Sequence, residues 1–293
     1  MYRAIYCTES GSNSPTLSGT SDNHQNRGVS LTCFTRKLYN HFQMKNDVAG
    51  TVAEWIREAR KIVVLTGYDL SAESGLPDFT DPRLNPHIRD FRESREVRAG
   101  YWKKIMDIYP SLLSAEPGPG HRALAELEVL GNLDCIFTQN ADGLHHRAGS
   151  VTVIELNSSI LWVTCPSCGK DYSIDEIAGM LDKGTPVPVC RECGSDQLKP
   201  AISFPGQPPP HWEAREAWMR LHSADLFLIA GASLDKEPVA SYPYLAKENN
   251  AKVVIINEKE GPADDHVDAV IYGKPGQVLG YILKKVKESI TIS

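Results

Sequence analysis

Short runs of aliphatic and β-branched residues recur along the chain, and most of them end in a glycine or a polar residue. Such runs are typical of buried strands, and they predict strands at 61–67, 133–138, 151–156, 225–231 and 252–257. Between them, apolar residues at helical spacing predict helices at 120–131, 242–250 and 275–287. Strands that alternate with helices indicate an α/β fold with a doubly wound parallel sheet.

The first 43 residues have a different pattern. They are rich in Ser, Asn, Thr and Gly, and their apolar residues follow no period. We predict that 1–43 is a disordered or misassigned extension and that Met44 is the natural start. A genuine tail with a targeting role is the alternative. Beyond it, Val52, Trp55 and Ile56 recur at helical spacing, and Asp47 is the expected N-cap of that helix.

Two stretches interrupt the alternation of strands and helices. Residues 77–119 are expected to form a mobile loop and a small helical insertion, the insertion covering 80–119. Residues 161–200 contain two C-x-x-C pairs, which are Cys165, Cys168, Cys190 and Cys193. Pairs at this separation are typical of a closed four-thiolate zinc site, which is structural and not catalytic. Four free thiols are the alternative. The large domain is then predicted to combine 44–160 with 201–293.

Composition adds limits on the class of protein. The chain has 293 residues, of which 41% are hydrophobic and 23% charged, and its net charge is −6. An acidic balance argues against direct nucleic-acid binding. No apolar run is long enough to cross a bilayer, and the N-terminus lacks the pattern of a secretory signal. We therefore expect a cytoplasmic protein without a membrane partner.

Polar and small residues cluster directly after several predicted strands. The first strand leads into residues 66–79, TGYDLSAESGLPDF, and the second into 138–145, TQNADGLH. The third is followed by Asn157 and Ser158, and the last two by 231–233 and Asn257. Ligands of doubly wound sheets bind outside the carboxyl ends of the strands, so we expect these residues to surround one cleft.

These motifs, in this order around a four-cysteine insertion, resemble the sirtuins, the NAD-dependent protein lysine deacylases. The resemblance covers about residues 45–290 and implies a Rossmann-like large domain with an inserted zinc ribbon. It also implies NAD as cofactor and an acyl-lysine protein or peptide as partner. The implied cofactor-binding residues are Gly67, Tyr68, Ser71, Asp78, Phe79, Gln139, Asn140, Asp142, Gly231, Ser233 and Asn257. Asn140 and Asp142 are also expected to take part in catalysis at the nicotinamide end.

The catalytic position departs from the family pattern. In sirtuins the Glu-Leu pair is followed by His-Gly, and the histidine is the catalytic base. Here Glu155-Leu156 is followed by Asn157 and Ser158. An amide does not titrate near neutral pH and cannot accept a proton as imidazole does. The resemblance therefore implies that deacylation is impaired or lost.

Four more departures fall in the motifs assigned to cofactor and substrate. The family's Gly-Ala-Gly-x-Ser loop has become Gly67-Tyr68-Asp69-Leu70-Ser71, which brings bulk and a negative charge toward the expected phosphate site. Thr80 replaces an arginine, and Pro205 interrupts the family's Phe-Gly-Glu peptide strand. His145 and His146 are not expected to replace the missing base.

Three hypotheses remain open at this point. The first is a sirtuin-fold pseudoenzyme that binds a nucleotide or a partner without efficient turnover. The second is an active but altered NAD-consuming enzyme, such as a weak deacylase or an NAD hydrolase, because nicotinamide cleavage does not need the missing base. The third is a non-catalytic interaction module that docks through the zinc ribbon.

Overall fold

The computed structural model describes residues 48–131, 133–208 and 211–290. The predicted N-terminal extension at 1–43 and the predicted N-cap at Asp47 lie outside the described residues. The helix expected after them is present, with residues 48–58 helical. Val52 and Ile56 on this helix are buried, as the helical spacing predicts.

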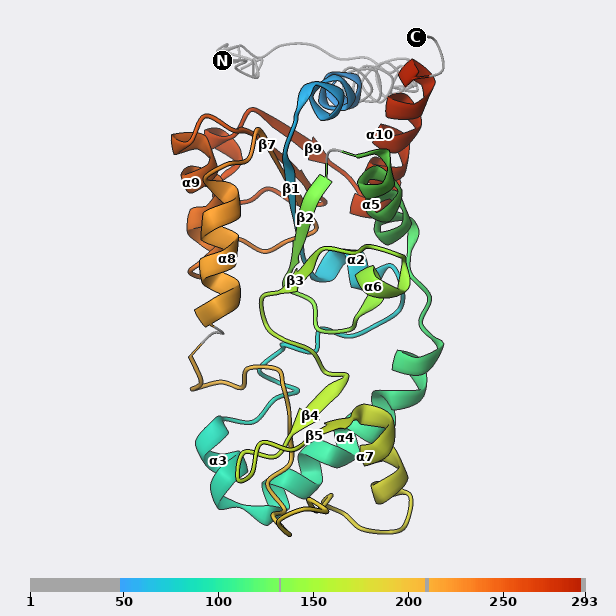
Figure 1. Ribbon diagram of the computed structural model, residues 1–293, viewed down its shortest axis with the longest axis vertical. Helices are drawn as coiled ribbons and strands as arrows, with labels where there is room; N and C mark the ends of the chain where they lie inside the picture. Colours follow the sequence, from blue (N-terminus) through green and yellow to red (C-terminus); the bar gives the residue numbers. More distant parts are fainter. Residues whose placement is uncertain (1–47, 132, 209–210, 291–293) are drawn as a thin grey trace, which may run out of the picture. The chain divides into compact units, whose positions relative to one another are not determined.

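A six-stranded, all-parallel sheet forms the centre of the large domain (Figure 1). Its strands are β1 (Ile62–Thr66), β2 (Leu133–Thr138), β3 (Val153–Glu155), β7 (Leu226–Ala230), β8 (Lys252–Asn257) and β9 (Ala269–Tyr272). The strand order is β3-β2-β1-β7-β8-β9. Strands β2 and β3 thus follow β1 toward one edge of the sheet, and β8 and β9 follow β7 toward the other edge. This order confirms the predicted doubly wound fold.

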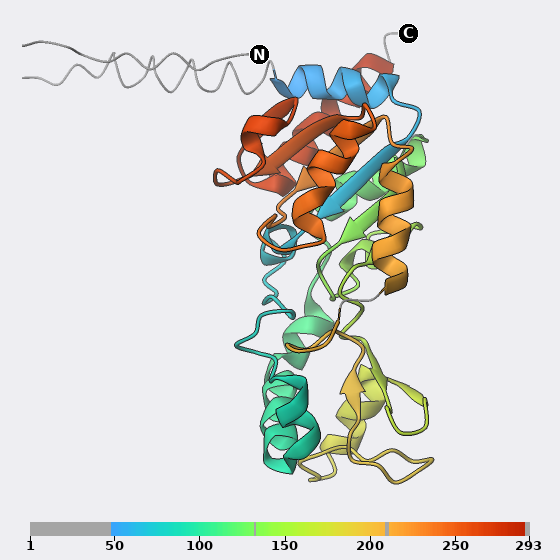
Figure 2. The same ribbon diagram turned by 90° about the vertical axis from the view of Figure 1, so that its left-hand side faces the viewer.

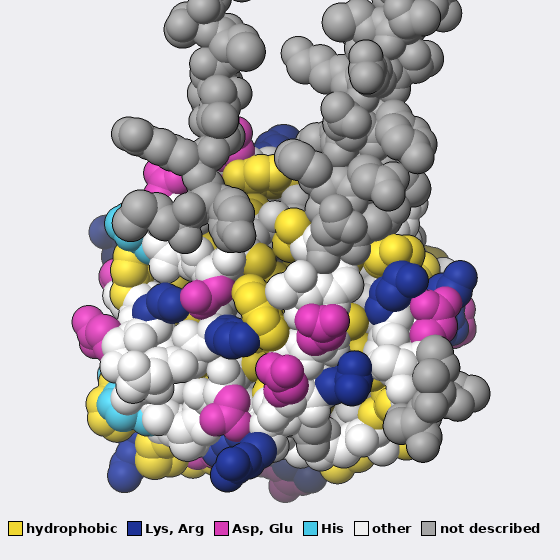
Figure 3. Space-filling model, turned by 90° about the horizontal axis from the view of Figure 1, so that it is seen from above, with side chains coloured by type: hydrophobic (Ala, Val, Ile, Leu, Met, Phe, Trp, Pro, Cys, Tyr) yellow, Lys and Arg dark blue, Asp and Glu magenta, His cyan; other side chains and the backbone are white. Residues whose placement is uncertain are grey.

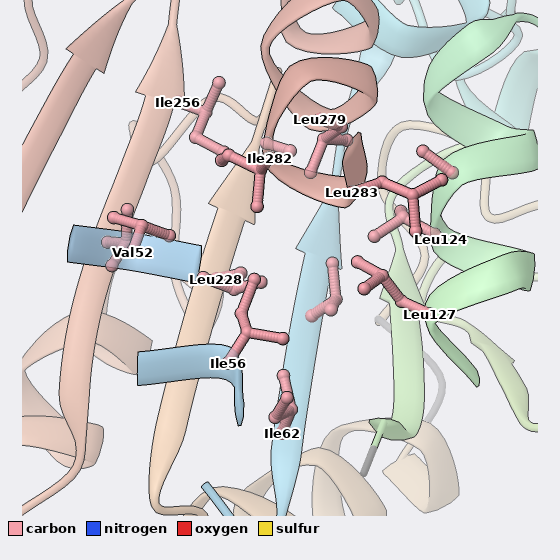
Figure 4. Close-up of a cluster of buried hydrophobic side chains, with 14 of the residues drawn as sticks. Val52, Ile56, Ile62, Leu124, Leu127, Leu228, Ile256, Leu279, Ile282 and Leu283 are labelled. Atoms are coloured by element: carbon pink, nitrogen blue, oxygen red, sulfur yellow. The ribbon is translucent and has the colours of Figure 1, made fainter. Parts of the chain in front are cut away.

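The two faces of the sheet bury alternate residues of each strand, as the period of two requires. Ile62 and Val64 of β1 belong to one hydrophobic cluster, whereas Val63 and Leu65 belong to the other. Helix 48–58, α5 (Pro119–Leu130) and α10 (Pro275–Ile290) cover the first face, with their side chains interleaved in Figure 4. Helices α8 (His211–Leu221) and α9 (Tyr242–Glu248) cover the other face (Figure 2).

The sequence predictions for this domain hold for all five strands and for the helices at α5, α9 and α10. Strand β9 and helix α8 had no counterpart among them. The remaining short elements are α2 (Tyr68–Ala72), α6 (Leu144–Arg147) and two 3₁₀ turns, Val239–Ser241 and Asp264–His266.

The two insertions share one hydrophobic cluster. The first contributes α3 (Ile88–Glu93) and α4 (Arg95–Ser114). The second contributes β4 (Trp162–Thr164), β5 (Asp171–Ser173), α7 (Ile174–Leu181) and β6 (Lys199–Pro200), whose strands form an antiparallel sheet in the order β5-β4-β6. Phe91 and Tyr101 of the first insertion pack edge-on against Phe204, which directly follows the second.

This shared core corrects one expectation about the first insertion. The helical insertion was expected to be small, but α4 alone has 20 residues. Its Trp102 and Ile105 are buried, and burying side chains of this size contributes roughly 1.5–3 kcal/mol each. The helical insertion is therefore held by the cysteine-rich insertion, and the two form one packed unit.

The surface seen from above carries charges of both signs. On the part of this face that the structure describes, cationic and anionic side chains are interspersed among smaller hydrophobic groups (Figure 3). Within the described ranges, no helix combines the length and the apolar character that a membrane span requires.

Candidate functional site

A cleft of about 810 Å³ opens at the carboxyl ends of β1 and β7. These two strands are adjacent in the sheet, and each is followed by a chain segment that lines the cleft. The strand order reverses between them, and the crevice at such a switch point is where doubly wound sheets bind their ligands. The fold therefore places the cleft where a nucleotide is expected.

Two glycines allow the turns after β1 and β7 to pack against each other. A Cβ atom on Gly67 would collide with backbone atoms of Gly231 and Ala232. Gly231 has a φ of +63°, in the left-handed region that favours glycine. The amide of Asp69 donates to the Gly231 carbonyl at 3.2 Å, which fixes the two turns together at the floor of the cleft.

Most of the expected cofactor residues line this cleft. Those that do are Tyr68, Asp78, Gln139, Asn140, Gly231, Ser233 and Asn257. Ser71, Phe79 and Asp142 are buried behind its wall, as is Gly67 at the end of β1. The sequence motifs therefore separate into residues that line the cleft and residues that are buried behind it.

The supporting residues form a buried chain of hydrogen bonds. Asn140 Nδ2 donates to Ser71 Oγ at 2.7 Å and to the Gly67 carbonyl at 2.9 Å. Ser71 Oγ in turn donates to Asp142 Oδ2 at 2.6 Å. Burial raises the pKa of Asp142, while the bond from Ser71 opposes that effect. This chain fixes the orientation of Asn140 toward the cleft, with its amide nitrogen already committed.

Asn157 lies in the cleft wall just beyond β3. Its Nδ2 donates to the backbone carbonyl of Gln139 at 2.7 Å. The amide nitrogen is thus engaged, and the remaining Oδ1 is an acceptor that has no titrating proton near neutral pH. The next residue, Ser158, has a φ of +59°. This is a left-handed conformation that glycine adopts freely and other L-residues adopt at a cost of about 1–2 kcal/mol.

All five departures from the sirtuin pattern line the same cleft. They are Tyr68, Asp69, Thr80, Asn157 and Pro205. Thr80 also donates through its backbone amide and its hydroxyl to Asp78 Oδ1, at 2.8 and 2.7 Å. The five departures, which lie far apart in the sequence, therefore gather around one cleft.

The cleft is more acidic than the motifs alone indicated. Besides Asp69 and Asp78, its lining includes Asp235, Glu237, Glu258, Glu260 and Asp264, against the cations Lys236 and Lys259. Burial raises the pKa of Asp69, and Glu258 raises it further. The sequence motifs did not include these loop carboxylates, although their positions after β7 and β8 were the available signal.

Two buried histidines lie close to the site but outside the cleft lining. His145 Nε2 is 2.8 Å from Thr66 Oγ1, and its ring centroid is 4.7 Å from that of His121. Burial holds the pKa of His145 well below its ordinary value and lowers that of His121 to about 4. Both imidazoles are neutral at physiological pH and are enclosed by the core, which gives His145 no access to a ligand as a base.

The four cysteines of the second insertion come together at one point. Their sulfur atoms all lie within 4.8 Å of one another. Cys165 Sγ is 3.6 Å from Cys193 Sγ, and Cys168 Sγ is 3.7 Å from Cys190 Sγ. A tetrahedral tetrathiolate centre with metal–sulfur bonds of about 2.3 Å has sulfur separations of about 3.8 Å. The thiols are therefore placed as ligands of one tetrahedral metal ion.

Comparisons with known proteins agree with this geometry. Residues 67–238 match the family described as the Sir2 family. The chain is 38% identical to an NAD-dependent protein deacylase of Archaeoglobus fulgidus over 244 residues, covering 80% of this chain and 94% of the relative. It is 39% identical to an NAD-dependent protein deacetylase of Geobacillus kaustophilus over 247 residues, covering 81% and 98%.

A solved structure of similar fold contains a bound peptide. The structure of Sir2Af2 bound to a myristoylated histone peptide aligns with a TM-score of 0.71 at 33% sequence identity, covering 84% of this chain and 99% of that one. The parallel sheet, the cleft at its switch point and the match to the family's sequence lead to one conclusion: this chain belongs to the Sir2 family of NAD-dependent deacylases and deacetylases.

Proposed function

We propose that this chain is a Sir2-family protein that binds NAD, or the ADP-ribose part of it, and that its deacylation step is strongly impaired. The observation that carries the proposal is the position of Asn157 in the cleft wall, with its amide nitrogen bound to the Gln139 carbonyl. Removing a general base typically slows a reaction by about 100- to 10,000-fold.

The adenosine end of the cleft supports nucleotide binding. Asn257 Nδ2 donates to the Ala232 carbonyl at 3.2 Å, and Gln139 Nε2 donates to the Ser233 carbonyl at 3.1 Å. These bonds fix the backbone of the turn after β7, where Gly231 has a left-handed φ of +63° and packs against Asp69 and Pro275. We assign this turn and Asn257 to the adenosine half of NAD.

The phosphate end fits NAD less well. The side chains of Tyr68 and Asp69 project where the family pattern has small residues, and the carboxylate of Asp69 repels a pyrophosphate. We therefore expect weaker NAD binding than in the active relatives. When bound, NAD supplies an electrophilic ribose carbon with nicotinamide as its leaving group.

A second candidate function follows from the buried chain of Asn140, Ser71 and Asp142. This chain is complete, and it holds the Asn140 side chain at the cleft wall. Because cleavage of the nicotinamide bond does not need the missing base, slow NAD hydrolysis or nicotinamide exchange is compatible with this site. An acyl-lysine side chain is the acyl donor that we propose for any remaining deacylation.

The four-thiolate cluster is assigned to one structural zinc ion. Four protein sulfurs fill a tetrahedral coordination shell, so no position is left for water or substrate. We therefore assign the metal no part in the reaction.

Titration calorimetry with NAD, combined with a turnover assay, separates the candidates. We expect measurable NAD or ADP-ribose binding and little release of nicotinamide in the presence of an acetyl-lysine substrate. Steady nicotinamide release without deacylation would favour the NAD hydrolase. Rapid deacylation by the unmodified chain would refute the proposal, and absence of any nucleotide binding would favour a non-catalytic interaction module.

A further inference from the structure

Three large apolar side chains are exposed on helix α8, which lies on the outside of the large domain (Figure 1, Figure 2). Trp212 is 65% exposed, Trp218 52% and Met219 44%. Together they present roughly 350 Å² of apolar side-chain surface to solvent. A single exposed apolar residue needs no explanation, whereas a patch of this size on one chain is typical of an interaction site.

The helical period gathers these side chains on one face. Ala217 and Leu221 of the same helix are buried in the core beside the sheet. With 3.6 residues per turn, the arc that points away from them contains both tryptophans, Met219 and Arg215. The acidic residues of the helix lie at the sides of this arc and not within it. The outer face of α8 is therefore aromatic, with one arginine near its centre.

Two side chains of this face, Trp218 and Arg215, are available to a partner in different ways. The Trp218 ring packs on His222 with a centroid separation of 3.9 Å, which orients the indole in advance. Burying a side chain that is already oriented costs less entropy on association. The Arg215 guanidinium forms no ion pair with any residue that the structure describes, whereas the adjacent Glu216 is paired with Arg220 at 2.8 Å. The face thus offers an ordered aromatic ring and an unpaired cation.

The outer face of α8 is complementary to a second copy of itself. When two such helices pack antiparallel about a twofold axis between residues 215 and 216, Trp212 lies at the level of Met219 of the partner subunit. In the same register, Arg215 lies beside Trp218 of the partner subunit. A thioether against an indole and a guanidinium against an indole are both favourable contacts. The twofold axis forms each of these contacts twice.

We propose that α8 is a self-association surface, through which two copies of this chain form an isologous dimer. A second copy fits this face better than an anionic lipid surface or a nucleic acid does. Glu213 and Glu216 flank the arc and would be repelled by such a surface, and the net charge of the chain is −6. One helix face buries less than the roughly 800 Å² per partner of a standard interface, so we expect a Kd in the micromolar range.

Sedimentation velocity of the full chain between about 1 and 200 μM tests the proposal. We expect a reversible dimer whose Kd lies between about 1 and 50 μM. Trp212→Ala should raise this Kd at least about tenfold, because buried tryptophans contribute most of the binding energy of an interface. Trp162→Ala is the matched control and should leave the Kd unchanged, since Trp162 is 57% exposed but lies on β4, outside this face.

Cysteine cross-linking tests the twofold register separately. Position 215 lies next to the axis, so Arg215→Cys should form a disulfide-linked dimer under mild oxidation. Asp107→Cys, at an exposed position of α4, should cross-link no more than the parent. Adding Trp212→Ala to Arg215→Cys should slow the cross-linking. If Trp212→Ala loses its fold, the Arg215→Cys protein and its control decide.

Three results would overturn the inference. The first is a full chain that stays monomeric at about 200 μM. If that chain dimerises once residues 1–43 are deleted, its own N-terminal segment is the occupant of the face. The second is a dimer whose Kd is unchanged by Trp212→Ala, and the third is equal cross-linking at positions 215 and 107. NAD affinity, measured on the same samples, reports on the proposed function alone, because none of the four side chains of this face lines the cleft.

Discussion

Asn157 and Gln139 are joined by a hydrogen bond of 2.7 Å from the Asn157 side-chain nitrogen to the Gln139 backbone carbonyl. The bond ties Asn157, the second residue beyond β3, to Gln139, which directly follows the paired strand β2. It orients an amide at the position where the family pattern has an imidazole. The cleft thus keeps a well-placed side chain, but one that cannot accept a proton near neutral pH.

The first prediction concerns the restoration of this base. Asn157→His alone should raise deacylation only slightly, because Tyr68, Asp69 and Thr80 still weaken the cofactor end. The combined variant Tyr68→Ala/Asp69→Gly/Thr80→Arg/Asn157→His should raise NAD-dependent deacylation by at least about 100-fold. The measurement is release of deacetylated product from free acetyl-lysine and from a peptide. The triple variant that keeps Asn157 is the control, and it should bind NAD more tightly without gaining deacylation.

The second prediction concerns the charge of Asp69. Asp69→Asn should tighten ADP-ribose binding about tenfold at low ionic strength, since it removes like-charge repulsion from a partly enclosed site. The gain should shrink toward about twofold at 0.5 M salt, where the Debye length is only a few ångströms. Asp107→Asn, on an exposed position of α4, is the control and should change nothing. Equal affinities of parent and variant at every salt concentration would place the phosphates elsewhere.

The third prediction concerns the four-thiolate centre. Cys168→Ser, or treatment with a strong chelator, should lower the thermal unfolding temperature and reduce the zinc content below one ion per chain, because metal binding stabilises the folded form of such a site. Elemental analysis and thermal denaturation provide the measurements. Ser167→Ala removes only the exposed hydrogen bond from Ser167 Oγ to Ser195 Oγ, and it should leave the zinc content unchanged because serine supplies no ligand here. A zinc-free protein of unchanged stability would contradict the assignment.

The fourth prediction uses the pKa of Glu155, which burial and the nearby Asp142 raise to about 7. Between pH 4.5 and 7 the folded state binds a proton that the unfolded state has released, so this residue lowers stability as pH rises through that range. Glu155→Gln should therefore raise the free energy of unfolding at pH 8, on the order of 1–3 kcal/mol. At pH 4.5 it should have little effect. Chemical denaturation at both pH values measures this, and Glu54→Gln on an exposed helix position serves as control.

The fifth prediction concerns the backbone at Ser158, whose φ is +59°. Ser158→Gly should stabilise the protein by roughly 0.5–1 kcal/mol, because relief of the left-handed strain exceeds the entropy that glycine adds to the unfolded chain. Denaturant midpoints provide the measurement. Ser158→Val should shift the midpoint in the opposite direction, since a β-branched residue tolerates this conformation least. A less stable glycine variant would mean that the serine makes a compensating contact.

The sequence alone determined the fold of the large domain and the four cysteines that come together in the second insertion. Buried parallel strands must be apolar along their whole length, so β1, β2, β7 and β8 were visible as continuous runs. The cysteine spacing was an equally direct signal of the sulfur cluster. Each C-x-x-C pair forms a turn of fixed length, and two such turns are enough to bring four sulfurs together. Most of the cofactor residues that the motifs indicated also line the cleft, since ligands of such sheets bind at strand ends.

Only the tertiary structure decided how these residues act together. The hydrogen bond between Asn157 and Gln139, and those of Lys199 with the carbonyls near it, depend on exact side-chain directions that spacing does not encode. The common core of the two insertions arises between segments that are separated in the sequence by strands β2 and β3, and no local pattern indicates such packing. The gathering of five changed residues around one cleft is likewise a property of the folded chain, because it results from the order in which the strands assemble.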